Sequence, residues 1–241
     1  MRFFDIPKPS LDSTRQMFIE LESDERTSKI DLGIGIYRDE NGLAPVFKSV
    51  KTAEKLLFEV ESSKSYKTPA GNSKYCKNIL DLVLGKAIID ERGDKIGSIQ
   101  IPGAGSGLRI AGELIKNNLQ NKLISIPNPT WGQQPFMFKK SGLKVINYNY
   151  YNQENNFLDF DNMIYDLKKL KSGDSILLHG CCHNPTGADL TVDQWEQVAN
   201  ICLKKGILPF IDLVYQGLGI GVDEDVLGIR KLVQIVPEVI I

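Results

Sequence analysis

The fold is decided by two stretches, S-I-L-L-H-G-C-C-H-N-P-T-G at residues 175–187 and G-I-L-P-F-I-D-L-V-Y-Q-G at residues 206–217. In each stretch, an apolar run typical of a buried strand ends in polar residues that packing does not require. Residues 190–205 between them read as a helix, because Thr191 can cap it and apolar residues recur at helical spacing. Strand, helix and strand predict a right-handed crossover between parallel, adjacent strands. Asn184 and Asp212 then lie at the carboxyl edge of one sheet, where open α/β sheets bind ligands.

The rest of the chain continues this alternation of helices and strands. Helices are predicted at 11–22, 46–61, 75–84, 161–170 and 226–235, and strands at 96–101, 122–127, 144–150 and 237–241. Such an order predicts an α/β fold with a mostly parallel sheet flanked by helices. We expect residues 1–44 to form an N-terminal arm and part of a small domain, and residues 45–241 to form a larger domain.

The bulk properties are those of an ordinary globular protein. The chain has 241 residues, 42% hydrophobic and 24% charged, and a net charge of −1. This charge offers no electrostatic case for binding nucleic acid or an anionic membrane. No apolar run approaches the roughly 20 residues of a membrane span, and the first residues lack the apolar core of a signal peptide. We therefore expect a cytoplasmic protein.

The four cysteines are too few and too unevenly placed for a disulfide framework. We expect them to be reduced and mostly buried. Cys181 and Cys182 stand between His179 and His183, but adjacent residues of a strand point to opposite faces, and no C-x-x-C pair is present. We therefore predict no metal site.

Asp212 is the residue that most needs an explanation. A carboxylate at the end of a buried strand loses hydration, and it is costly unless a cation or hydrogen bonds compensate. A protonated ring nitrogen of a bound cofactor would supply such a cation.

The two stretches, H-N-P-T-G followed by F-I-D-L-V-Y-Q-G, resemble the class I aminotransferases of the aspartate and aromatic amino acid type, which use pyridoxal 5′-phosphate (PLP). The resemblance runs from about Asp31 to the last residue. It implies fold type I, with residues 45–241 as the PLP-binding major domain, incomplete at its C-terminus. It also implies a homodimer that transaminates between an amino acid and a 2-oxo acid.

The resemblance assigns roles at the two ends of residues 175–217. Asp212 would pair with the pyridinium nitrogen, and Tyr215 and Asn184 would hydrogen-bond the phenolic oxygen of the cofactor. Asn184 would also help to hold the substrate carboxylate. His179 is expected to be a hydrogen-bonded core histidine rather than a proton carrier.

A glycine-rich turn, P-G-A-G-S-G at residues 102–107, opens a predicted helix. Free backbone N–H groups at a helix N-terminus bind phosphate, although the residues alone fit a plain tight turn somewhat better. The G-x-G-x-x-G pattern fails, which disfavours a nicotinamide-dependent dehydrogenase. The family resemblance implies that Ala104, Gly105 and Ser106 hold the cofactor phosphate.

Four further positions follow from the resemblance. Trp131 would stack on the cofactor ring and contact the substrate, where the residues alone also allow a core tryptophan. Tyr66 would reach the phosphate in the partner subunit's site, and Gly35 would lie by the substrate, although a plain role in a turn is equally open for Gly35. At Gln134 many relatives have a histidine behind the strand carboxylate, so the surroundings of that carboxylate are altered here.

The chain ends in P-E-V-I-I, which reads as a strand cut off in progress. In the family, S-x-S-K follows, and its lysine forms the Schiff base. No lysine of this sequence matches that position, so we expect the 241-residue chain to be inactive alone. The alternative is a non-catalytic truncated paralogue that binds PLP or another phosphate noncovalently, or that dimerises with a complete subunit. The preferred amino acid stays open.

Overall fold

The computed structural model describes residues 13–30, 35–66 and 68–241, and the chain divides into two units, Met1–Ser65 and Tyr66–Ile241. In the described part of the first unit, helix α1 spans Ser13–Ser23 and helix α2 spans Lys48–Val60. Both helices were predicted, although residues 11 and 12 lie outside the described residues. Helix α2 buries none of its side chains. The predicted domain boundary near residue 45 stays a prediction.

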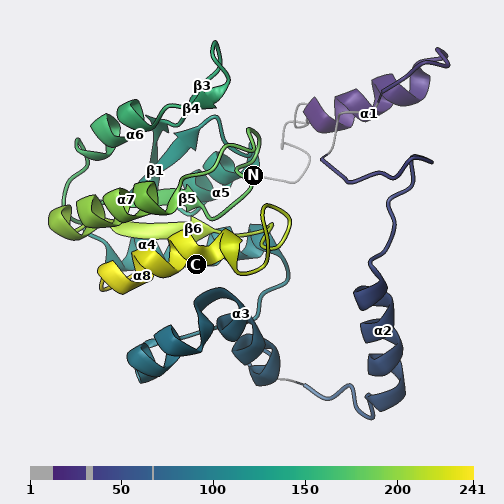
Figure 1. Cartoon of the computed structure of the whole chain (residues 1–241), viewed down its shortest axis with the longest axis horizontal. Helices are drawn as coiled ribbons and strands as arrows, with labels where there is room; N and C mark the ends of the chain where they lie inside the picture. The colour runs from purple at the N-terminus through teal and green to yellow at the C-terminus, as the bar shows by residue number, and fades with distance from the viewer. Residues whose placement is uncertain (1–12, 31–34, 67) are drawn as a thin grey trace, which may run out of the picture. The chain divides into compact units, whose positions relative to one another are not determined.

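The second unit is built on a four-stranded parallel sheet, shown in Figure 1. Its strands, in the spatial order β2-β1-β5-β6, are Lys144–Asn149, Leu123–Asn128, Ser175–His179 and Leu208–Asp212. A small antiparallel hairpin, β3 at Tyr151–Asn152 and β4 at Phe157–Leu158, follows β2. The predicted parallel pairing of the two central stretches is confirmed, because β5 and β6 are neighbours from Ser175↔Leu208 to His179↔Asp212.

Helices flank this sheet, as the sequence predicts, and α3 packs against α8 (Figure 1). They are α3 at Ser73–Arg92, α4 at Ala104–Asn118, α5 at Gln133–Lys140, α6 at Phe160–Leu167, α7 at Val192–Lys205 and α8 at Leu227–Ile235, with short 3₁₀ turns η2 at Gly93–Lys95 and η3 at Glu224–Val226.

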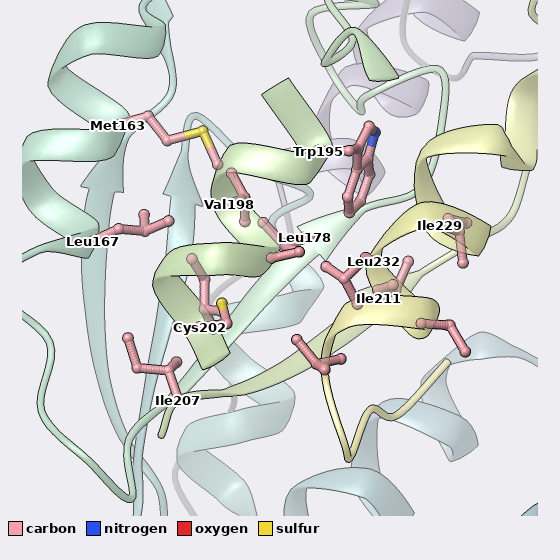
Figure 2. Packing of buried hydrophobic residues seen from close by; sticks show 14 of the residues in the cluster. Met163, Leu167, Leu178, Trp195, Val198, Cys202, Ile207, Ile211, Ile229 and Leu232 are labelled. Carbon is pink, nitrogen blue, oxygen red and sulfur yellow. The ribbon is translucent and has the colours of Figure 1, made fainter. Parts of the chain in front are cut away.

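The strand residues alternate between two hydrophobic clusters, one on each face of the sheet. Ile176 and Leu178 of β5 join the cluster formed with α6, α7 and α8, which Figure 2 shows from close by. Leu177, between them, joins the cluster formed with α4 and α5. Because successive side chains of a strand point to opposite faces, a continuous apolar run is what a sheet covered on both faces requires.

Helix α7 has the ends that its sequence predicts. The hydroxyl of Thr191 accepts a hydrogen bond from the N–H of Gln194, and the Gln194 side chain accepts one from the N–H of Thr191 at 2.9 Å. At the other end, Gly206 adopts the left-handed conformation, with φ 65° and ψ 42°. Because Gly206 ends the helix, β6 begins two residues later and pairs with β5.

Three local predictions are wrong. Residues 96–101 do not form a strand, because they have no ladder partner among the described residues, and the N–H of Gln100 donates to Ala70 O instead. The segment 237–241 makes a single parallel bridge, Phe210↔Ile240, rather than a full strand. Cys181 and Cys182 are not on a strand, because β5 ends at His179 and Cys182 has a φ of 48°.

Helix α3 is broken at Gly85, where φ is 75° and ψ is 158°. The break frees backbone carbonyls, and side chains from the C-terminal part of the unit satisfy them. Arg230 donates to Val83 O and Leu82 O at 3.0 and 3.1 Å, and Gln216 donates to Leu82 O at 3.0 Å. Helix α8 and the loop after β6 are thereby joined to α3.

Across the described part of the chain, none of the helices combines the length and the apolar character that crossing a bilayer demands. Three of the four cysteines are buried, as expected: Cys76, Cys181 and Cys202.

The contact between α7 and α8 depends on a glycine. A methyl group added at Gly228 would overlap the indole of Trp195, which is only 3% exposed. We expect Gly228→Ala to lower the free energy of unfolding by about 1–2 kcal/mol, because overpacking outweighs the gain of about 1 kcal/mol in helix propensity. Chemical denaturation measures the change. Gly97→Ala is the control, since its methyl group would meet no atom within 4 Å. Equal or greater stability of Gly228→Ala would contradict this packing.

Candidate active site

The carboxyl ends of three neighbouring strands bring predicted site residues to one edge of the sheet. Asp212 is the last residue of β6, Asn184 lies in the loop after β5, and Trp131 lies in the turn between β1 and α5. The N–H of Gly180 donates to Asp212 O at 2.9 Å, which continues the pairing of the two strands. The predicted grouping of Asp212 and Asn184 at this edge agrees with the parallel register.

Asp212 is partly buried, and burial raises the pKa of its carboxyl group. The opposing effect is one hydrogen bond, donated by Gln134 Nε2 to Asp212 Oδ2 at 2.6 Å. Within the described residues, neither lysine nor arginine lies in salt-bridge range of this carboxylate. The carboxylate is therefore held by a neutral donor, Gln134, at the carboxyl end of β6.

Gln134 is 1% exposed and belongs to a small polar network behind Asp212. The hydroxyl of Thr130 donates to Gln134 Oε1, and His179 Nε2 lies 3.1 Å from the same oxygen. On the other side of the imidazole, the N–H of Asn184 donates to His179 Nδ1 at 3.2 Å. His179 is thus hydrogen-bonded, as predicted, and it links the Asn184 loop to the residues that hold Asp212.

Asp189, an exposed residue, holds the backbone of the Asn184 loop. This carboxylate accepts hydrogen bonds from the N–H groups of Cys182 and His183, at 2.7 and 2.9 Å. The hydroxyl of Tyr150 donates to Ala188 O at 2.6 Å. Hydrogen bonds of this kind fix backbone that belongs to no helix or strand, and they therefore fix the position of Asn184.

Three rings stack behind the loop. The Tyr150 and His183 rings are 4.0 Å apart at 22°, and the His183 and His179 rings are 4.4 Å apart at 27°. Burial lowers the pKa of His179 to about 4, and burial together with the neighbouring His179 lowers the pKa of His183 to about 3. Both imidazoles are therefore neutral at pH 7.

Helix α4 begins in the glycine-rich turn, as predicted, with Ala104 as its first residue and Gly103 at φ 90° before it. The first N–H groups of a helix have no partner within the helix, so those of Ala104, Gly105 and Ser106 are available to an anion. The hydroxyl of Ser106 lies 3.4 Å from Pro102 O, to which it donates. The predicted phosphate site thus coincides with a helix N-terminus, and phosphate binding there stays a prediction.

Tyr215 follows β6 in a loop organised by Asp225. The Asp225 carboxylate accepts hydrogen bonds from four backbone N–H groups, at distances of 2.7 to 3.3 Å: those of Gly217, Gly219, Ile220 and Gly221. Partial burial acts to raise the pKa of Asp225, but these N–H groups hold it below its ordinary value.

Two further predicted site residues are exposed, and their roles stay predictions. The side chain of Tyr66 is fully exposed, at the start of the second unit. Gly35 belongs to the first unit and is exposed. The sequence analysis did not identify Asp189 or Asp225 as residues that hold the loops of the site. For Asp225, the sequence offers one signal, an acidic residue shortly after G-L-G-I-G.

The described residues do not bring three or more histidine, cysteine, aspartate or glutamate side chains together in a group that could hold a metal ion.

Comparison with known proteins shows which family this chain resembles. A model of class I and II aminotransferases matches residues 27–241. The aspartate aminotransferase of Escherichia coli K12 is 40% identical over 221 residues, which cover 91% of this chain and 55% of that protein. The tyrosine aminotransferase of Rhizobium meliloti is 41% identical over 218 residues, covering 90% of this chain and 55% of that protein. The chain thus spans about half the length of these curated relatives.

Solved structures match over nearly all of the chain. An aromatic amino acid aminotransferase with 3-indolebutyric acid superposes with a TM-score of 0.92 at 37% identity, covering 99% of this chain and 60% of that one. An aromatic-amino-acid aminotransferase from Burkholderia pseudomallei, covalently bound to pyridoxal phosphate, matches with a TM-score of 0.91 at 29% identity, covering 97% of this chain and 59% of that one.

The Asp225 contacts predict a pH-dependent contribution to stability. A carboxyl group whose pKa is lowered in the folded state stabilises that state above its unfolded pKa of about 3.9, and the contribution is lost as the pH falls through the folded value. We expect Asp225→Asn to lower the unfolding midpoint in urea at pH 7, and the difference from the native chain to shrink between pH 5 and pH 2. A difference that persists unchanged in acid would show that the charge of Asp225 is not what holds the loop. Asp81→Asn, at an exposed position on α3, is the matched control.

Proposed function

This chain belongs to the class I and II aminotransferase family, and from that premise we propose that it serves PLP-dependent transamination between an amino acid of the aspartate or aromatic type and a 2-oxo acid. The observation that carries the proposal is the Asp212 carboxylate, partly buried at the sheet edge with a neutral amide as its donor. Such a carboxylate is complementary to a protonated ring nitrogen.

The residues at the edge fit PLP. Asp212 offers a negative charge, the start of α4 offers backbone N–H groups to a phosphate, and the indole of Trp131 lies in the turn after β1. When bound, PLP supplies an electron sink for the carbanion formed at the α-carbon of the amino acid.

Each residue would have a distinct task. Asp212 holds the proton on the ring nitrogen, because its negative charge raises the pKa of a neighbouring base. Tyr215 and Asn184 donate hydrogen bonds to the phenolic oxygen of the cofactor. Trp131 covers one face of the ring.

The remaining roles concern the phosphate and the substrate. Ala104, Gly105 and Ser106 hold the phosphate through backbone N–H groups and the Ser106 hydroxyl, and Tyr66 of the partner subunit adds a contact. Gly35, Trp131 and Asn184 would lie by the substrate. The homodimer and the cytoplasmic location stay predictions.

The lysine that would bind PLP covalently distinguishes this proposal from the alternative function. The 241 residues hold no lysine that matches the family's anchoring position, so we infer that this chain alone binds PLP noncovalently and does not transaminate. The rival is a non-catalytic module that binds PLP or another phosphate, or that pairs with a complete subunit. Borohydride reduction followed by mass spectrometry would detect a cofactor linked to one specific lysine, which this inference excludes.

We expect the chain to bind PLP, and Asp212→Asn to weaken that binding about 10- to 100-fold, because a charge-assisted hydrogen bond of about 1.5–3 kcal/mol is lost. Titration by protein fluorescence or PLP absorbance measures the dissociation constant. Asp81→Asn is again the control and should bind as the native chain does. Equal affinity of Asp212→Asn and the native chain would refute the proposed role of Asp212.

Turnover can be tested in a form of the protein that carries the anchoring lysine. There we expect Asp212→Ala to abolish transamination and Asp212→Glu to retain part of it, because only the second keeps a negative charge near the ring nitrogen. A coupled assay with aspartate and with an aromatic amino acid measures both the loss and the preferred substrate. Full activity of Asp212→Ala would contradict the role proposed for Asp212 at the ring nitrogen.

A further inference from the structure

We propose that Gln134 and His179 form a charge-neutral relay with one fixed imidazole tautomer, which positions Asp212 relative to the backbone of Asn184. The ligand that this relay serves rests on the proposed function, whereas the relay itself is a property of the chain. The two residues act through Asp212 and Asn184, so they are positioning residues.

The Asn184 backbone determines one nitrogen of the imidazole. Its N–H points at His179 Nδ1 across 3.2 Å, and a backbone N–H can only donate. Nδ1 must therefore carry a lone pair. A neutral His179 then has its proton on Nε2.

The Asp212 carboxylate determines the orientation of the Gln134 amide. Asp212 Oδ2 is 2.6 Å from one end of the amide, and an ionised carboxylate only accepts, so that end is the NH₂ group. The other end, Oε1, then lies 3.1 Å from His179 Nε2 and accepts its proton. The amide nitrogen lies 3.0 Å from the same ring nitrogen, but it directs its hydrogen to Asp212. The hydroxyl of Thr130 donates to the same oxygen.

Every donor in this chain of contacts thus meets an acceptor, and reversing either group breaks it. A proton on His179 Nδ1 would face the N–H of Asn184, and a flipped amide would face the carboxylate with its oxygen. The same argument excludes the imidazolium ion, which carries protons on both nitrogens. The burial that lowers the pKa of His179 to about 4 acts in the same direction.

The relay gives Asp212 a donor that does not titrate. The titratable groups around His179 are Asp212 on β6, reached through Gln134, and His183 with Tyr150 stacked beyond it. Gln134 and Thr130, which lie between the imidazole and the carboxylate, have no ionisable group. The hydrogen bonding of Asp212 therefore stays constant across the pH range in which a histidine at position 134 would change its charge.

Nitrogen NMR of the imidazoles tests the tautomer directly, because His179 and His183 are the two histidines of the sequence. His179→Phe assigns the signals. We expect His179 to show a protonated Nε2 and an unprotonated Nδ1, unchanged from pH 8 to pH 5, with titration beginning only toward pH 4. A proton on Nδ1, a mixture of tautomers or a midpoint near 6.5 would overturn the proposal.

PLP affinity tests the positioning role. His179→Phe keeps a ring in the stack but loses both hydrogen bonds, so we expect a dissociation constant about 10-fold higher. Unchanged affinity would mean that the ring serves packing alone and would overturn the positioning role. If the native chain fails to bind PLP, the proposed function fails, and the NMR result still decides the relay.

Gln134→His gives an independent pH profile. Its dissociation constant for PLP, divided by that of the native chain at each pH, removes the titration of the ligand itself. We expect this ratio to change at least threefold between pH 6 and pH 9, because an imidazolium at position 134 would compete for the Asp212 charge as the pH falls. A flat ratio would overturn the claim that an untitratable donor is what Gln134 contributes.

Discussion

The structure of the site depends on keeping one negative charge at the end of a parallel strand. Removing a carboxylate from water is costly, and the fold offsets this cost with a short hydrogen bond from a buried amide. The amide is held in turn by Thr130 and His179, which come from a turn and from the neighbouring strand. The parallel sheet is what makes this possible, since it delivers the ends of β1, β5 and β6 to one edge.

The two loops around this charge are stabilised in the same way. In each, an aspartate carboxylate accepts hydrogen bonds from several backbone N–H groups. Asp189 holds the turn before Asn184, and Asp225 holds the glycine-rich segment after Tyr215. Glycine-rich backbone has many alternatives in the unfolded chain, so a fixed loop needs directional contacts. The side chains proposed to meet the cofactor are thus placed by neighbours that would never touch it.

The central part of the fold was predictable because its signals are local. The apolar runs before Asp212 and Asn184, and the Thr191 cap between them, each identify an element within a few residues of sequence. Residues 96–101 have the same apolar character, yet a strand also needs a partner, and the pattern of one segment cannot supply that information. The hydrogen bonds of Asp189 and Asp225 could not be predicted for a related reason, since the tertiary fold decides which groups meet them. The family resemblance placed Gln134 behind the carboxylate, and the structure adds its contacts with Thr130 and His179.

Strand β6, which carries Asp212, is the last strand in the sheet order, and Ile240 meets its outer side through one bridge. Backbone donors and acceptors left unpaired along such a border attract any extended segment that can align with them. Among the described strands, β6 is one of the two at the edges of the sheet, and it is also the one that holds Asp212. An extended segment that paired with β6 would therefore meet the same strand end on which the Asp212 carboxylate sits.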